Sequence, residues 1–106
     1  MPYAGGPMTE AMYYVLLALL NPSHGYRLMQ DIETVSHGRL KMGPGTLYGV
    51  LTRMQHDGLI KLEPAEGRRK VYRMTPGGRD ALSAEYERLK AMVLDGAAIE
   101  GSGIDG

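Results

Sequence analysis

The sequence contains no cysteine among its 106 residues, and this absence excludes several kinds of chemistry. Disulfides, thiolate zinc sites and cysteine nucleophiles all require that residue, and its lack fits a reducing compartment. The three histidines, at positions 24, 37 and 56, do not have the spacing of metal ligands. No serine or carboxylate is paired with a plausible base. We therefore expect no catalytic site, no cofactor and no metal.

The sequence also lacks an apolar run long enough to cross a membrane. The longest, residues 11–20, is clearly shorter than the roughly 20 residues that a spanning helix needs. A signal peptide has a basic segment that leads into an apolar one, and the first seven residues do not have this pattern. We expect a cytoplasmic protein with no membrane partner.

The sequence has no net charge, since 12 basic residues balance 12 acidic ones, but these charges are unevenly distributed along the chain. Residues 36–80 carry nine Lys or Arg and only four Asp or Glu, so the two ends of the chain are acidic. A local basic segment is typical of a polyanion site, because phosphate binding depends on local charge. A chance distribution over a solvated surface would give the same count.

Hydrophobic periodicity predicts four helices and one hairpin in a single domain. Thr9, Ser23 and Thr75 are the expected helix N-caps, and Gly58 is expected to end the third helix in a left-handed conformation. Gly77 and Gly78 should weaken the first turn of the last helix. The predicted helices cover residues 10–20, 24–35, 44–56 and 76–95, and the predicted strands cover residues 59–63 and 70–74.

This order predicts a mainly helical winged helix-turn-helix domain at residues 8–75, with the small β-hairpin as its wing. Residues 1–7 should form a flexible arm, residues 76–95 a dimerisation helix, and residues 96–106 a disordered tail. Apolar residues recur along the last helix at spacings of four, three and four, which is typical of a seam between two helices. The seam consists of Leu82, Tyr86, Leu89 and Val93.

The second helix of a helix-turn-helix enters the DNA major groove, so the outer face of residues 44–56 is informative. It carries glycines, hydroxyl groups and an arginine but no acidic residue, whereas a plain solvated face would carry Glu and Lys. Three consecutive basic residues in the wing suit phosphate contact, or protection of an edge strand by charge. The predicted DNA-binding residues are Thr46, Tyr48, Gly49, Thr52, Arg53, Arg68, Arg69 and Lys70.

The first helix carries Met and Tyr side chains that could line an effector pocket. Met12 and Tyr13 are the candidates for contact with a flat, apolar molecule at a dimer interface. A Met/Tyr stripe is also typical of an ordinary core. The helix is apolar on most sides, which predicts that one side packs on its own domain and another on a second subunit.

The string GPGTLYG at residues 43–49, together with several other segments, resembles the PadR family of bacterial transcriptional regulators. This string is the most specific, and the likeness covers residues 8–95. With a single helix after the wing, the chain resembles the short subgroup, and this resemblance puts a large C-terminal effector domain in doubt. The other similar segments are TEAMYYVLLAL at 9–19, HGY at 24–26, DGLI at 57–60, RKVY at 69–72 and TPGGR at 75–79.

The resemblance implies a homodimeric repressor that binds an inverted-repeat operator, with some members released by phenolic or drug-like effectors. It implies DNA contacts from Thr46, Tyr48, Thr52, Arg53, Arg69 and Lys70. The alternative is a winged-helix ligand-sensing or protein-interaction module that acts mainly through a partner, which the acidic ends and zero net charge support. The absence of acidic residues from the outer face of the third helix favours DNA.

Overall fold

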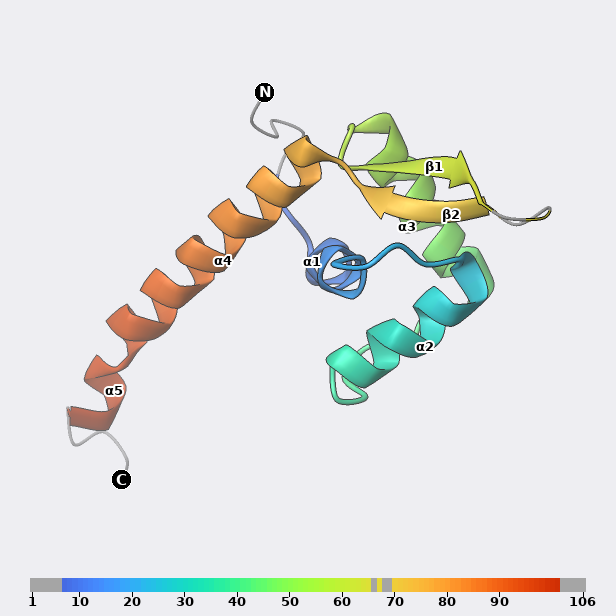
Figure 1. Ribbon diagram of the computed structural model, residues 1–106. Coiled ribbons are helices and arrows are strands. Elements are labelled where there is room, and N and C mark those ends of the chain that lie inside the picture. Colours follow the sequence, from blue (N-terminus) through green and yellow to red (C-terminus); the bar gives the residue numbers. More distant parts are fainter. Residues whose placement is uncertain (1–6, 66, 68–69, 102–106) are drawn as a thin grey trace.

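The structure is a computed structural model that describes residues 7–65, 67 and 70–101. Three helices form the body of the domain, a two-stranded hairpin lies beside them, and a long helix extends away from the body (Figure 1). This order confirms the predicted mainly helical winged helix-turn-helix fold. The elements are α1 (Glu10–Ala18), α2 (Gly25–Val35), α3 (Pro44–His56), β1 (Ile60–Pro64), β2 (Lys70–Met74), α4 (Pro76–Gly96) and α5 (Ala98–Gly101).

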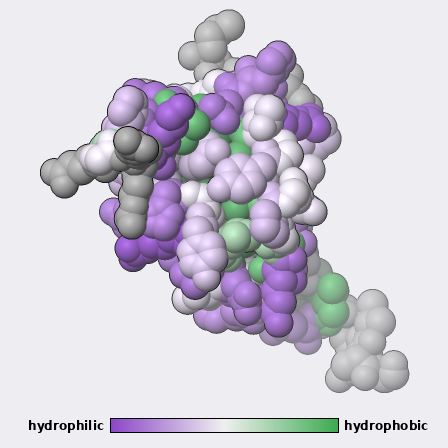
Figure 2. Space-filling view, turned by 90° about the vertical axis from the view of Figure 1, so that its right-hand side faces the viewer, coloured by the Kyte–Doolittle hydropathy of each residue, from purple (hydrophilic) through white to green (hydrophobic). Residues whose placement is uncertain are grey.

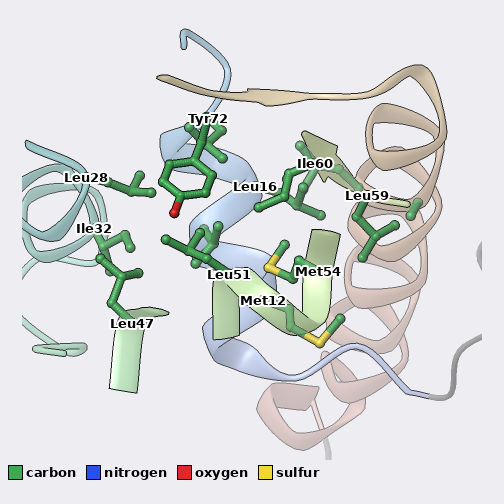
Figure 3. Close-up of a cluster of buried hydrophobic side chains, with 14 residues drawn as sticks. Met12, Leu16, Leu28, Ile32, Leu47, Leu51, Met54, Leu59, Ile60 and Tyr72 are labelled. Carbon is green, nitrogen blue, oxygen red and sulfur yellow. The ribbon is translucent and has the colours of Figure 1, made fainter. Parts of the chain in front are cut away.

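The core lies where α1, α2, α3 and the hairpin meet, and α1 is at its centre. Val15 and Leu16 of α1 are fully buried, because the helix packs against α2, α3 and α4. Figure 3 shows buried side chains from these elements pointing toward one another. This packing orients α3, whose inner residues are fixed in the core. Labelled members of the cluster are Met12, Leu16, Leu28, Ile32, Leu47, Leu51, Met54, Leu59, Ile60 and Tyr72.

Two of the three predicted helix caps are confirmed, and the third is wrong. The hydroxyl oxygens of Thr9 and Thr75 accept hydrogen bonds from the backbone N–H groups of Met12 (3.1 Å) and Gly78 (2.9 Å). The N-cap of α2 is His24 rather than Ser23, and the His24 Nδ1 atom accepts a hydrogen bond from the Arg27 N–H at 3.4 Å. Helix α1 ends at Ala18, two residues before the predicted end.

Ser23 has a different structural role, because its backbone pairs with the hairpin. Its N–H donates to the Tyr72 carbonyl at 3.1 Å, and the Tyr72 N–H donates to the Ser23 carbonyl at 2.8 Å. The connector between α1 and α2 thus adds an isolated bridge to β2, while β1 pairs with the other edge of β2 from Ile60↔Met74 to Pro64↔Lys70. The two-residue bridge fixes the wing to the helical body.

Two glycines determine how the hairpin joins the helices. Gly58 has φ of 77°, which confirms the predicted left-handed residue at the end of α3. Gly78 is buried at the start of α4, where a β-carbon would overlap the Leu59 carbonyl oxygen and lie 3.0 Å from Met74 Cγ. We expected this glycine only to weaken the helix, but it allows the first turn of α4 to touch the backbone before β1.

The C-terminal part is helical further along than expected. Helix α4 continues to Gly96 and α5 covers Ala98–Gly101, so the prediction of disorder is wrong for residues 96–101. Backbone hydrogen bonds from Ala97 to Leu94 and from Glu100 to Ala97, both 3.1 Å, extend the helical path. Residues 102–106, and residues 1–6 of the predicted arm, lie outside the described residues. Among the described helices, none is long and apolar enough to span a bilayer.

Candidate nucleic-acid interface

Helix α3 presents one buried face and one exposed face. Leu47, Leu51 and Met54 are fully buried in the core, so their spacing determines which residues face outward. The five DNA-binding residues predicted on this helix are all exposed and lie together. We define the outer face of α3 as seven of its exposed residues, which are Gly45, Thr46, Tyr48, Gly49, Thr52, Arg53 and His56.

Figure 2 shows the side of the molecule that carries the α2/α3 pair. Residues of intermediate hydropathy gather at its centre, and strongly hydrophilic residues surround them. Small and hydroxyl-bearing side chains such as Gly49 and Thr52 have this intermediate character, and both are exposed. A surface of this kind permits close approach of a partner without removing a dense layer of charge from water.

Tyr48 connects the outer face of α3 to the first turn of α2. Its side chain is 45% exposed, and its hydroxyl lies over Gly25, which is buried. The Thr52 hydroxyl, one turn further on, donates to the Tyr48 carbonyl at 2.8 Å. Its donor is therefore satisfied within the helix, and the Thr52 oxygen presents its accepting side outward.

At the end of α3, an arginine and a histidine lie beside a half-buried carboxylate that was not among the predicted site residues. Asp57 Oδ2 lies 3.6 Å from Arg53 Nε, and Asp57 Oδ1 lies 3.6 Å from His56 Nδ1. The Arg53 and His56 side chains are 59% and 89% exposed, whereas that of Asp57 is only 17% exposed. The spacing of four between Arg53 and Asp57 could have identified this pair from the sequence.

The wing carries an additional basic pair across its two strands. Lys61 and Arg73 are directly opposite in the antiparallel register, and both approach Glu63. The hydrogen bond from Arg73 lowers the pKa of Glu63 below its ordinary value, although partial burial opposes this shift. Lys70 is exposed at the start of β2, while the predicted contacts Arg68 and Arg69 lie outside the described residues.

The predicted seam on α4 is divided between the core and the exposed part of the helix. Leu82 is buried in the domain and Leu89 is half-buried, but Tyr86 and Val93 are 50% and 72% exposed. The second half of the seam lies on the part of α4 that extends away from the body (Figure 1). Further exposed apolar residues on this end of the molecule are Met92, Leu94 and Ile99.

A hollow of about 380 Å³ lies between the beginning of α1 and the middle of α4. Tyr13, one of the two candidate effector contacts, lines it with its ring edge-on to that of Tyr14 at 5.9 Å, and burial raises the Tyr13 pKa. Met12 does not line the hollow, because it points into the core and is 3% exposed. The lining residues are Met8, Thr9, Glu10, Tyr13, Tyr14, Arg39, Glu85, Arg88 and Leu89.

The sequence matches a known family over most of its length. The profile of the Transcriptional regulator PadR-like family matches residues 15–84. Transcriptional regulator Rv3488 of Mycobacterium tuberculosis is 41% identical over 78 residues, which are 71% of this chain and 70% of the relative. Transcriptional regulator YqjI of Escherichia coli is 33% identical over 94 residues, which are 80% of this chain and 45% of the relative.

An uncharacterized 37.1 kDa protein in transposon Tn4556 of Streptomyces fradiae is 39% identical over 83% of this chain, which spans only 26% of that protein. Two of these three relatives are thus more than twice as long as the region that the chain matches. The family and the two regulators are described as controlling transcription, which confirms the predicted resemblance and the expectation that the chain is not an enzyme.

Solved structures share the fold. A transcriptional regulator from Clostridium thermocellum gives a TM-score of 0.67 at 23% identity and covers 90% of each chain. A PadR-like transcription factor from Bacteroides fragilis gives 0.62 at 29% identity, over 79% of this chain and 86% of that one. PadR of Bacillus subtilis, solved in complex with operator DNA, gives 0.63 at 19% identity, over 76% of this chain and 48% of that one.

Proposed function

Because the chain belongs to the PadR-like family of transcriptional regulators, we propose that it binds a specific DNA operator with α3 in the major groove. The observation that carries this proposal is the outer face of α3, which is exposed, free of acidic residues and rigidly oriented by Leu47, Leu51 and Met54. The shared fold of Bacillus subtilis PadR, which was solved on its operator, supports it.

The proposed contacts divide by chemistry. Small and hydroxyl-bearing residues at the centre of the outer face suit base edges, and cations at its edge and on the wing suit phosphates. Thr46, Tyr48, Gly49 and Thr52 form the first group. Arg53 and Lys70 form the second, together with Arg68 and Arg69 of the wing sequence.

We also propose that the protein acts as a homodimer on an inverted repeat. Tyr86 and Val93 are large apolar residues on a helix that extends into solvent, and a second copy of the same helix would remove them from water. A twofold axis through such a contact would present two α3 helices, and binding requires them to be about 34 Å apart.

The hollow beside Tyr13 is the proposed effector site, and the protein is a proposed repressor. The two tyrosine rings suit a flat phenolic or apolar molecule, and the hollow lies against the helix that would set the distance between the two DNA-binding domains. Binding there would change that distance and release the operator.

The experiment that tests DNA recognition is selection of bound duplexes from fragmented genomic DNA, followed by anisotropy titration of the recovered duplexes at two salt concentrations. We expect a palindrome with half-sites about one turn apart and tight, salt-sensitive binding. Absence of enrichment, with weak binding that disappears as salt rises, would contradict the proposal and favour a module that acts through a protein partner.

Two matched glycine variants test whether α3 is the element that contacts DNA. A β-carbon at Gly49 or at Gly96 meets no atom within 4 Å, so a side chain can start at either position without a clash. We expect Gly49→Glu to abolish binding of the selected duplex, because its carboxylate would face the phosphates. Gly96→Glu, which adds the same charge at the end of α4, should keep it. Equal binding by the two variants would show that α3 is not the contacting element.

A further inference from the structure

Asp57 occupies a position that is costly for the fold. It is the C-cap of α3, where a carboxylate meets the negative end of the helix dipole. Its side chain is only 17% exposed, and within the described residues its buried Oδ2 atom has no hydrogen-bond partner. Burial of a charged oxygen without a hydrogen bond destabilises a folded protein. Hydrogen bonding within the described residues therefore does not account for the buried position of Oδ2.

The carboxylate is instead oriented toward an exposed arginine and an exposed histidine of α3. Arg53 Nε lies 3.6 Å from its Oδ2 and His56 Nδ1 lies 3.6 Å from its Oδ1. Both distances are too long for hydrogen bonds, but the separation of Asp57 and Arg53 is within the range of an ion pair. Arg53 and His56 are also members of the outer face of α3. Asp57 thus contacts two side chains of the proposed DNA interface from a less exposed position.

We infer that Asp57 is a positioning residue for operator recognition, which holds the Arg53 guanidinium in the direction that the specific complex requires. This inference rests on the proposed function of α3. An oriented guanidinium binds well only in the one docking register that matches its direction. Without the carboxylate, the guanidinium would be held less firmly in that direction, and nonspecific binding would gain at the expense of the operator.

The chain contains a matched control for this pair. Arg27 and Asp31 on α2 have the same spacing of four and nearly the same separation, 3.7 Å from Nε to Oδ2. The Asp31 side chain, however, is 37% exposed and is not at a helix end. Asp31→Asn changes the net charge as Asp57→Asn does, but without removing a half-buried anchor. A pure charge effect on DNA binding would be the same in both variants.

The test measures binding of a duplex recovered in the wild-type selection and of a scrambled duplex of equal length and composition. We expect Asp57→Asn to reduce the ratio of the two affinities about five- to tenfold, with tighter binding of the scrambled duplex. Asp31→Asn should leave the ratio within about twofold. In an Arg53→Ala background, Asp57→Asn should have no further effect on the ratio, because the side chain it positions is absent.

Three outcomes would overturn the inference. The ratio could be unchanged in Asp57→Asn, could fall equally in Asp31→Asn, or could fall as much without Arg53 as with it. If the Asn variant does not fold, Asp57→Glu keeps the charge and displaces it by one methylene, and the ratio should still fall. A wild-type protein that selects no duplex refutes the proposed function and this inference together, whereas selection with an unchanged ratio refutes the inference alone.

Discussion

The phenol of Tyr48 on α3 packs directly over the α-carbon of Gly25 in the first turn of α2. A β-carbon at residue 25 would overlap the Tyr48 hydroxyl and lie 2.8 Å from Cζ of the ring. Because Tyr48 is also 45% exposed, one side of the ring lies on α2 while the other belongs to the outer face of α3. Gly25 therefore determines where a proposed base-contacting side chain lies.

Substitution of Gly25 by alanine should displace Tyr48 without unfolding the domain. The colliding atoms are at the far end of a flexible side chain, so we expect a change of less than about 1 kcal/mol in the free energy of unfolding. Selectivity for the selected duplex should fall as far as it does in Tyr48→Ala. Anisotropy on the double variant is the check, because losses that add would show that the two residues act independently.

A β-carbon at Gly78 would meet backbone rather than the end of a side chain, so substitution of this glycine should destabilise the protein strongly. The Leu59 carbonyl that a β-carbon would hit is backbone and also accepts a hydrogen bond from the Thr75 N–H at 3.0 Å, so it cannot move aside. We expect Gly78→Ala to lower the free energy of unfolding by about 2–3 kcal/mol, the upper end for overpacking. In a thermal melt this is a fall of roughly 10 °C or more.

Gly49→Ala is the control for that experiment. The position is in the middle of a helix, and a β-carbon there has no neighbour within 4 Å. Alanine should therefore stabilise the protein by about 0.5–1 kcal/mol through helix propensity. A Gly78→Ala protein that melts at the wild-type temperature would show that α4 can shift away from Leu59.

The sequence predicted local features of the fold correctly, but it could not predict contacts between distant segments. The caps at Thr9 and Thr75 and the outer face of α3 depend on residues close in the sequence, and local patterns predicted them correctly. The contact of Gly78 with Leu59, and the pairing of Ser23 with Tyr72, join segments 19 and 49 residues apart. A propensity scale contains no term for such contacts, so Gly78 was predicted to be only a weak helix former.

The wrong placement of Met12 has a related cause. Helix α1 is apolar on most sides, so its periodicity does not show which residues face the core. Only the packing of α1 against α2, α3 and α4 separates buried Met12 from Tyr13, which lines the hollow. The Asp57 pair was missed for another reason, since ion pairs at spacing four are common and their burial depends on the tertiary fold.

The ion pair between Glu63 and Arg73 predicts how stability changes in acid. Arg73 lowers the pKa of Glu63 in the folded protein below its ordinary value of 4.5. A carboxylate with a depressed folded pKa stabilises the protein above its unfolded pKa, and that contribution is lost as the pH falls through the folded pKa. We expect Glu63→Gln to melt below the wild type at pH 6 and the difference to disappear as the pH falls below about 4.5.

Arg73→Gln tests the cause of that pH dependence. If Arg73 is responsible, its removal should make the melting temperature fall less steeply with decreasing pH, as Glu63→Gln does. The double variant should then show the same pH dependence as either single variant. The Lys61 Nζ atom, 3.6 Å from Glu63, is the other nearby cation. A steep acid limb that remains in Arg73→Gln would assign the stabilisation to Lys61 instead.

Val93 allows a test of the proposed dimer that does not disturb the monomer. Its side chain is 72% exposed, so Val93→Glu should leave the fold of a single chain intact while placing a charge in the seam. Sedimentation equilibrium should then show monomers. Ala91→Glu adds the same charge nearly opposite on the helix, because successive residues are about 100° apart, and should remain dimeric. A full dimer in Val93→Glu would show that the seam is not the interface.

The wing makes a prediction that salt titration can isolate. Lys70 is exposed at the start of β2, and if its ammonium contacts a phosphate, binding releases about one counterion. Lys70→Ala should therefore reduce the slope of log affinity against log salt by roughly 1, for the selected and the scrambled duplex alike. Lys90→Ala removes a cation from α4 that lies 5.5 Å from the Tyr86 ring and pairs with Glu87, so its slope should equal that of the wild type. A reduced slope in Lys90→Ala but not in Lys70→Ala would mean that DNA lies along α4 rather than against the wing.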